Sequence, residues 1–390
     1  MTRAMKFLSI YVIPGAVFEA ITVGGGYGTG REIVQYFTQY GTTGGLLGLL
    51  VATLCMAVVV ATTFEFARRF RAYEYRTLIA GLTGPGWMLY EILGVTMLLL
   101  VLAVTGVAAG SILANTFGIS TWAGVALMFA LIVVLNFYGR AAVIRVLAFW
   151  SLLLVIVFVA YFVLVSQRYG TVTLAALRTG DIHPGWFLSG LQYSLYNVAA
   201  VPMMLYATRS IETRAQALIS GAIAAVFAMS LGLLFHLSFA AAPPAVLSQD
   251  LPTHWMIDSL SMKPLMIAYI VVLFGTMIKT CAGIMQGVNE RLDEWSVRRT
   301  GRALSRPRHA LVAGLAILLS GGLSSFGLAA LIARGYGSMA WGFLLIYILP
   351  LLTVGIWKLI RSGSRAAAEP QLHAVPTALQ PQATKPTRRG

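Results

Sequence analysis

The sequence has few charged residues and almost no cysteine. Only 11% of its 390 residues are Asp, Glu, Lys or Arg, while 58% are hydrophobic. A soluble domain carries about 25% charged residues, because it must cover its surface with groups that water can solvate. The composition therefore excludes an ordinary soluble fold. The two cysteines, Cys55 and Cys281, fall in apolar stretches, which favours small packing residues over a disulfide or a metal site.

Catalytic and nucleotide-binding motifs are also missing. The sequence has no Walker loop, no His-Glu-x-x-His string, no cysteine pair with metal-ligand spacing and no Asp-Pro-Gly-Asn string. We therefore expect no enzyme activity, no cofactor and no metal, with an intramembrane enzyme as a minor alternative. The net charge of +15 would suit a nucleic-acid partner, but the basic residues are spread over alternate short loops and the C-terminal tail. No nucleic-acid binding is expected.

Long apolar stretches recur along the whole chain. Most reach the roughly 20 residues that cross a bilayer core of about 30 Å, and in lipid such stretches must be helical. The first lacks a signal-peptide cleavage site and contains Pro14 and Glu19, so we interpret it as an uncleaved span. The predicted spans are residues 7–38, 43–67, 86–116, 120–138, 142–166, 185–207, 214–241, 264–289, 309–332 and 338–360.

The basic residues predict the orientation of these spans. With a cytoplasmic N-terminus, 22 of the 28 Lys and Arg residues fall on the cytoplasmic side and four on the other, as the positive-inside rule requires. We expect a ten-span domain over residues 1–361 in a bacterial-type inner (plasma) membrane, with both termini cytoplasmic. Residues 362–390 are rich in Pro, Ala and Gln, which predicts a disordered cytoplasmic tail.

The first span contains a run of glycines from Gly24 to Gly30. Five of these seven residues are Gly, and each costs about 1 kcal/mol in a helix interior relative to Ala. The span is also too long for one straight helix, because its 32 residues would extend about 48 Å. We predict a break in the helix, since unwound backbone at membrane depth is tolerated where it lines a cavity. The alternative is that the glycines only allow close helix packing.

The sixth span shows a second interruption. It carries Asn197 near its middle and Pro202, whose missing amide removes a helical hydrogen bond. The first and sixth spans occupy corresponding places in two halves of five helices, and the odd number makes the halves opposite in topology. Paired interrupted helices in inverted repeats indicate the binding site of a transporter.

The string from Gly24 to Glu32 resembles the first-helix motif of the YkvI-like amino acid permease family of the amino acid–polyamine–organocation superfamily. Gly24, Gly26, Tyr27, Gly30 and Glu32 match this motif, whereas Arg31 stands where the family usually has Gln. The resemblance implies a LeuT-type fold: an all-α bundle of five plus five inverted transmembrane helices, with helices 1 and 6 broken. It further implies that the substrate lies between spans one, three, six and eight.

Residues at the two breaks are therefore candidates for substrate binding, although the tyrosines among them could equally be packing residues. These candidates are Gly24, Gly26, Tyr27, Gly28, Thr29, Gly30, Tyr193, Tyr196 and Asn197.

Ionisable residues inside the spans are candidates for coupling and gating. Glu19 precedes the break, and Lys279 lies in span eight beside Thr280. We hypothesise that the Lys279 ammonium pairs with Glu19 where related folds bind sodium, so that protons drive transport; a structural ion pair and sodium coupling are the alternatives. Arg31 and Glu32 could form an outer gate, Arg31 could bind a substrate carboxylate, or both could be structural.

Three further ionisable residues favour structural roles. Glu65 and Glu91 lie near cytoplasmic span ends, where pairing with arginine is expected, and His236 fits a hydrogen-bonded helix histidine better than a proton relay.

These features predict a secondary active transporter that moves a small solute by alternating access. The expected solute is an amino acid or a related amine or carboxylate, and the expected coupling ion is H⁺ in preference to Na⁺. The partners are thus this small molecule, the ion and the lipid bilayer. A LeuT-fold ligand sensor without net transport is the main alternative, and a channel is a further one.

Overall fold

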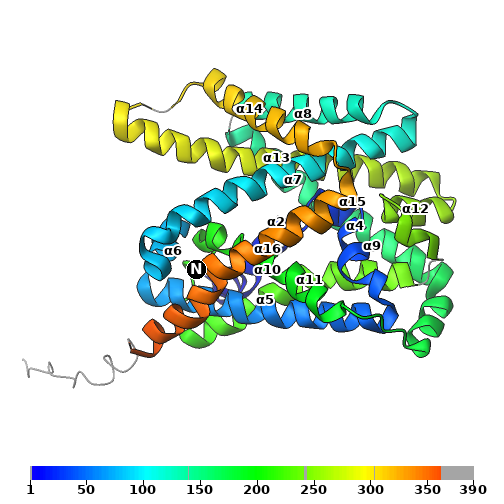
Figure 1. Ribbon diagram of the computed structural model, residues 1–390, viewed down its shortest axis with the longest axis horizontal. Coiled ribbons are helices and arrows are strands. Elements are labelled where there is room, and N and C mark those ends of the chain that lie inside the picture. The colour runs from blue at the N-terminus through cyan, green and yellow to red at the C-terminus, as the bar shows by residue number, and fades with distance from the viewer. Residues whose placement is uncertain (1, 139, 241–243, 303, 362–390) are drawn as a thin grey trace, which may run out of the picture.

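The computed structural model describes residues 2–138, 140–240, 244–302 and 304–361 (Figure 1). The side chains of several residues between 135 and 152 and between 279 and 306 lie outside this description. Within the described ranges every regular element is a helix. The predicted tail at 362–390 lies outside the described residues, so the proposed division of the chain at residue 361 stays a prediction.

The first span is broken, as the glycine run predicts. Its N-terminal part, called the inner half after the predicted orientation, ends at Thr22. A single turn covers Gly25–Gly28, and the C-terminal part, called the outer half, begins at Arg31. The backbone is extended at Gly24 and left-handed at Gly30, where φ is 82°. The elements of this span are α1 (Arg3–Phe7), η1 (Leu8–Val12), α2 (Ile13–Thr22), α3 (Gly25–Gly28) and α4 (Arg31–Tyr36).

The sixth span is broken as well. Its α-helix ends at Val198, and a 3₁₀ helix begins at Val201, directly before Pro202. The elements from the second to the sixth span are η2 (Thr38–Tyr40), α5 (Thr42–Phe70), α6 (Tyr75–Thr83), η3 (Gly84–Gly86), α7 (Trp87–Phe117), α8 (Thr121–Tyr138), α9 (Arg140–Thr179), α10 (Trp186–Val198) and η4 (Val201–Thr208).

The remaining spans correct one predicted boundary. The predicted ninth span reached residue 332 and the tenth began at 338, but the ninth helix ends at Ser324 and the last span begins at Leu328. Gly327, with φ of 78°, makes the turn between them. Arg334, one of the four basic residues counted on the non-cytoplasmic side, therefore lies within the last span and not between the two spans. The elements are α11 (Arg214–Ala240), η5 (Pro244–Ser248), α12 (Pro252–Ser259), α13 (Lys263–Thr300), α14 (Arg306–Ser324), α15 (Leu328–Ala330), η6 (Leu331–Tyr336), α16 (Gly337–Phe343), η7 (Leu344–Ile348) and η8 (Leu351–Gly355).

Within the described residues, seven helices are long and apolar enough to cross a membrane, which supports a multi-pass membrane protein. They are Arg3–Thr22, Thr42–Phe70, Tyr75–Phe117, Leu153–Thr179, Arg214–Ala240, Lys263–Ala282 and Leu328–Arg361. The other predicted spans are α8, whose apolar part is the shorter segment Thr121–Val134, the divided sixth span, and α14.

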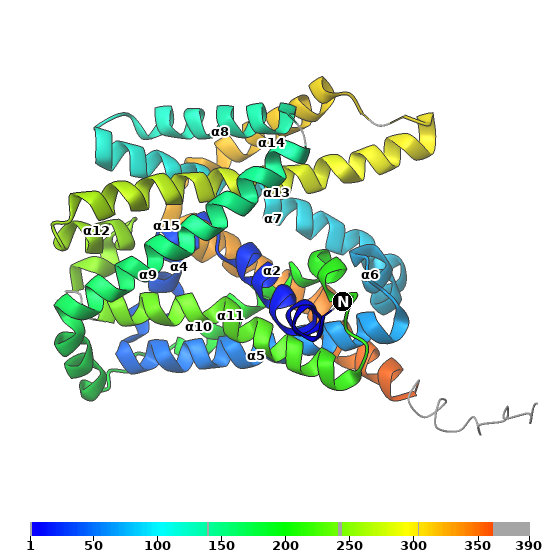
Figure 2. The ribbon, with the colours of Figure 1, turned by 180° about the vertical axis from the view of Figure 1, so that it is seen from behind.

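The helices form two groups with the broken first span between them. One group contains α7, α8, α13 and α14, and the other contains α5, α10 and α11 (Figure 1). The inner helix α2 packs against α11 and η4, whereas the turn α3 contacts α7 and α13. Figure 2 shows α9 crossing the back of the molecule, where it packs against α13 and α11. The break thus lies where the two groups meet.

Candidate substrate site at the break of the first span

The unwound backbone of the first span is held by side chains and backbone from other elements. The amide of Thr253 in α12 donates a hydrogen bond to the carbonyl of Thr29 (3.0 Å). The Tyr269 hydroxyl in α13 donates to the carbonyl of Gly28 (3.3 Å). The Thr29 hydroxyl donates to the carbonyl of Gly26 (2.8 Å). Carbonyl groups that the broken helix would leave unpaired are therefore satisfied within the protein, as membrane depth requires.

Glu32 places a buried carboxylate against this break. Glu32 lies in the first turn of the outer helix α4, and its side chain is 4% exposed. One carboxylate oxygen, Oε2, accepts a hydrogen bond from the Tyr196 hydroxyl of the sixth span (2.9 Å). The other, Oε1, lies so close to Gly26 that a Cβ atom there would overlap it. Glycine at position 26 is therefore what lets the carboxylate approach the backbone of the break.

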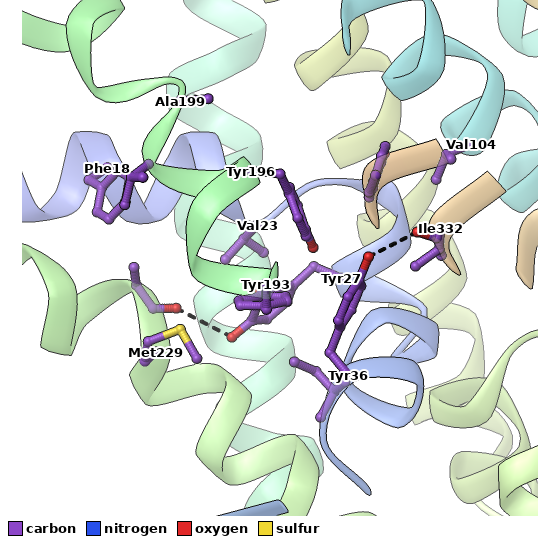
Figure 3. Close-up of a cluster of buried hydrophobic side chains, with 14 of the residues drawn as sticks. Phe18, Val23, Tyr27, Tyr36, Val104, Tyr193, Tyr196, Ala199, Met229 and Ile332 are labelled. Carbon is purple, nitrogen blue, oxygen red and sulfur yellow. Dashed lines mark hydrogen bonds between the residues drawn. The ribbon is translucent and has the colours of Figure 1, made fainter. Parts of the chain in front are cut away.

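An aromatic cluster joins the outer parts of the first, sixth and last spans. It consists of Tyr36, Phe37, Tyr193, Tyr196 and Tyr336. The ring centroids of Tyr36 lie 5.5 Å from Tyr193 and 5.6 Å from Tyr196, and Tyr196 lies 5.0 Å from Tyr336. The Tyr36 hydroxyl donates to the carbonyl of Ile332 (2.9 Å), as Figure 3 shows. These rings are buried and fill the space between three spans beside Glu32.

Four buried hydroxyls around the break have no hydrogen-bond partner in the described part of the chain. They belong to Thr105, Tyr193, Thr253 and Thr280. A Cβ atom on Gly25 would lie 3.1 Å from the Thr105 hydroxyl oxygen, and one on Gly24 would lie 3.9 Å from the Thr280 methyl group. Unpaired buried polar groups are costly, so their gathering at one place indicates a site where a bound molecule supplies the partners.

Arg31 faces away from this site. Its Nη1 atom donates to the carbonyls of Leu247 (2.7 Å) and Gln249 (3.0 Å), and its Nη2 atom donates to the Gln35 side chain (3.2 Å). The guanidinium therefore anchors the loop that leads from η5 to α12. Its Nη atoms are thus occupied, while its buried Nε atom has no hydrogen-bond partner in the described part of the chain.

The other predicted site residues lie in different surroundings. The Tyr27 hydroxyl points to the carbonyl of Ala228 (3.4 Å), and its ring packs edge-on against Phe235, so this side chain is turned toward α11. Asn197 donates to the carbonyl of Tyr193 one turn earlier (2.9 Å). Glu19 is half-buried on α2. The Lys279 side chain lies outside the described residues, so its pairing with Glu19 stays a prediction.

The structural roles expected for two ionisable residues are confirmed. Glu65 makes a two-pronged ion pair with Arg68, with both distances at 2.7 Å. Both ring nitrogens of His236 have partners, the Thr38 hydroxyl (3.1 Å) and the carbonyl of Thr42 (2.8 Å).

The sequence prediction missed Tyr36, Tyr336 and Thr105. Tyr36 follows Glu32 by four residues and so lies on the same helix face, a signal that could have identified it. Thr105 shares its long apolar span with Thr96 and Ser111, so the sequence alone does not single it out. Nothing local distinguishes Tyr336, because it joins the site through the packing of the last span.

Comparison with known proteins supports the fold. No family model matches the chain. It is 23% identical over 282 residues to the uncharacterized membrane protein YkvI of Bacillus subtilis (strain 168), which covers 72% of this chain and 80% of that protein. Among solved structures, MhsT in complex with L-phenylalanine matches with a TM-score of 0.56 and 16% identity, covering 92% of this chain and 98% of that one. The Eremococcus coleocola manganese transporter in complex with an aromatic bis-isothiourea compound matches with a TM-score of 0.54 and 14% identity, covering 90% and 80%. Together with the two breaks, these matches show that the chain has the LeuT-type fold of five plus five inverted helices.

Proposed function

We propose that this protein is a secondary active transporter that moves a small solute by alternating access, driven by an ion gradient. The main support for the proposal is the break of the first span, which has the buried carboxylate of Glu32 on one side and unpaired hydroxyls around it. A matching break in the sixth span supports it, because transporters built from inverted repeats bind their substrates between such helices. The proposed solute is an amino acid or a related amine or carboxylate.

The similar proteins support this choice without identifying the solute. MhsT was crystallised with an amino acid, L-phenylalanine, and the Eremococcus coleocola protein is a manganese transporter. No group of three or more His, Cys, Asp or Glu side chains that could hold a metal ion occurs in the described part of the chain. An organic solute therefore fits the described residues better than a metal ion. Membership of the amino acid–polyamine–organocation superfamily belongs to the same proposal, as does a bacterial inner-membrane location.

The two halves of the first span are held differently, which is what alternating access needs. α12 holds Thr29 just before the outer helix, and α10 and the last span hold α4 itself through the hydrogen bonds of Tyr36 and the aromatic cluster. The inner helix α2 leaves Ile13, Ala16 and Ile21 exposed. A helix broken at the substrate lets one half move while the other stays in place.

We retain the proton as the proposed coupling ion. Glu19, Lys279 and Thr280 form the proposed coupling site on the inner side of the break, with sodium as the competing ion. Glu32 adds a second buried ionisable group at the break. Uptake that continues without sodium, follows a pH gradient and is lost in Lys279→Met would support proton coupling, while strict sodium dependence would overturn it.

Two measurements test the proposed function. The first is a thermal-shift screen of the purified protein in detergent against amino acids, amines and carboxylates at several pH values, with and without sodium, because a ligand that binds the folded state raises its stability. The second is uptake of the strongest binder into proteoliposomes with an imposed ion gradient. Gradient-driven uptake is the expected result. A ligand that binds tightly but shows neither uptake nor exchange would instead support the alternative, a LeuT-fold sensor.

A further inference from the structure

We propose that the site recognises its substrate through a positively charged amine that binds Glu32, and that the substrate carries an apolar or aromatic group next to this amine. The inference rests on the proposed function, because it names the substrate class of the same site. It differs from recognition through Arg31, which would select a carboxylate.

The first step concerns the charge of Glu32. The side chain is 4% exposed, and the one hydrogen-bond donor that it has in the described part of the chain is the Tyr196 hydroxyl. No described Lys, Arg or His forms an ion pair with it. A buried carboxylate without a counter-charge is strongly disfavoured unless a cation or a proton joins it. A cation beside the carboxylate or a proton on it would therefore stabilise Glu32, and the cation that we propose is the ammonium group of the substrate.

The break has few basic groups that could bind a substrate carboxylate. Arg31, the nearest basic residue in sequence, has both Nη atoms bound to the loop before α12 and to Gln35. The described residues thus offer a substrate carboxylate one basic N–H at the break, the buried and unpaired Nε of Arg31. They offer an ammonium group one carboxylate and the hydroxyl oxygens of Thr105 and Tyr193, each of which can accept an N–H hydrogen bond.

The third step concerns the surroundings of Glu32. Tyr196 holds the carboxylate, and its ring contacts Tyr36, Tyr193 and Tyr336. Aromatic faces attract cations through their electron-rich surfaces and also bury apolar groups. A substrate with an amine beside an aromatic or branched aliphatic group would satisfy both properties. Figure 3 shows Tyr193 and Tyr196 of the sixth span gathered with the tyrosines of the first span.

Two matched sets of small molecules test the inference. The first set is phenethylamine, 3-phenylpropionate and L-phenylalanine, and the second is isoamylamine, 4-methylpentanoate and L-leucine. Within each set the molecules present an amine alone, a carboxylate alone, or both. Dissociation constants are measured for the full-length protein in detergent by thermal shift and calorimetry between pH 6 and pH 8.

The wild-type protein should bind the amines and the amino acids, and should bind the carboxylates about tenfold more weakly or worse, because a hydrogen bond to a charged partner is worth that much in affinity. Glu32→Gln should weaken amine binding by about tenfold or more and remove the discrimination. Tyr196→Phe removes the hydrogen bond to the carboxylate, so the affinity for amines should change, but amines should still bind more tightly than carboxylates because Glu32 remains. Glu65→Gln serves as a matched control that removes a buried acid on the cytoplasmic side, and it should not change the preference for amines.

Three results would overturn the inference. These are carboxylates that bind as well as amines, amines that do not bind the folded wild-type protein, and a folded Glu32→Gln variant that binds amines as the wild type does. In the last case, a simultaneous loss of pH-dependent uptake would assign Glu32 to the proton. If Glu32→Gln does not fold, the comparison of amines with carboxylates in the wild type and in Tyr196→Phe still tests whether the site prefers amines. Selective amine binding without uptake would contradict the proposed function alone, and uptake of carboxylates without amines would contradict this inference alone.

Discussion

The outer and inner halves of the first span differ in how they are held, although one continuous chain segment forms both. In the outer half, α4, the carbonyl of Tyr36 accepts a hydrogen bond from the Ser189 hydroxyl (2.8 Å), and the Tyr36 hydroxyl donates one to the carbonyl of Ile332. The inner half is tied by the Ser220 hydroxyl to the carbonyl of Ile10 (2.7 Å) and by an exposed ion pair between Lys6 and Glu212 (3.0 Å).

This difference predicts which half of the first span can move at the lower cost in free energy. Buried hydrogen bonds and ring contacts around α4 would all have to separate for the outer side to open. The inner half also has a buried hydrogen bond, from the Ser220 hydroxyl to the carbonyl of Ile10. Its ion pair, however, lies in solvent, where it contributes little. We therefore expect the inner half to move first and the outer half to act as part of the fixed frame in this state.

The largest loss of stability is expected from Gly30→Ala, which alters the start of the outer half. Gly30 has φ of 82°, a conformation that costs a residue with a side chain about 1–2 kcal/mol. A Cβ atom would also overlap the Phe239 ring and lie 2.7 Å from the Thr253 hydroxyl, and such overpacking costs about 1–3 kcal/mol. The free energy of unfolding, measured by denaturation in detergent, should fall by both amounts.

Gly118→Ala is the matched control for Gly30→Ala. Gly118 has φ of 68°, but a Cβ atom at this position would have no neighbouring atom within 4 Å, so this variant reports the backbone cost alone. Equal losses in the two variants would contradict the close packing of the outer half.

A smaller effect is expected from Tyr36→Phe. The variant keeps the aromatic cluster but removes the hydrogen bond to the carbonyl of Ile332, which contributes about 1 kcal/mol. Backbone amide exchange over residues 31–40 and 328–336 should accelerate about fivefold, since these segments lose a shared contact. Unchanged exchange in the last span would show that the bond does not hold the outer side closed.

The smallest effect is expected from Lys6→Met on the inner half. The Lys6 and Glu212 side chains are 51% and 63% exposed, so the pair contributes at most about 0.5 kcal/mol, and salt should screen it. Unfolding of Lys6→Met, Glu212→Gln and the double variant at low and high salt measures the coupling between the two residues. A loss as large as that of Tyr36→Phe would remove the contrast between the two halves.

Much of the fold could be predicted from the sequence, because membrane insertion imposes strong local rules. The apolar stretches predicted the helices, and the glycine run from Gly24 to Gly30 and the pair Asn197 and Pro202 predicted both breaks. The boundary between the last two spans was misplaced, because the glycines at 321 and 322 stay helical while Gly327 makes the turn. Composition alone does not distinguish a glycine that ends a helix from one that lies within it.

The site was less predictable, because its contacts join residues far apart in the sequence. Glu32 was identified as an ionisable residue at the break, but its partner Tyr196 is 164 residues away. Arg31 had the chemistry to bind a carboxylate, yet the carbonyls of Leu247 and Gln249 occupy it. No local pattern indicates which of these partners a charged side chain meets.

The close approach of Glu32 to the break is tested most directly by solute uptake in Gly26→Ala. A Cβ atom at position 26 would overlap the Glu32 carboxylate, so this variant should fold but displace the acid from the site. Gly94→Ala is the control, because a Cβ there would meet only the end of Met203 at 3.7 Å. With the strongest binder of the screen in proteoliposomes, we predict uptake near the wild-type rate for Gly94→Ala and a loss of about tenfold or more for Gly26→Ala. Wild-type uptake in a folded Gly26→Ala protein would contradict a substrate site at the break of the first span.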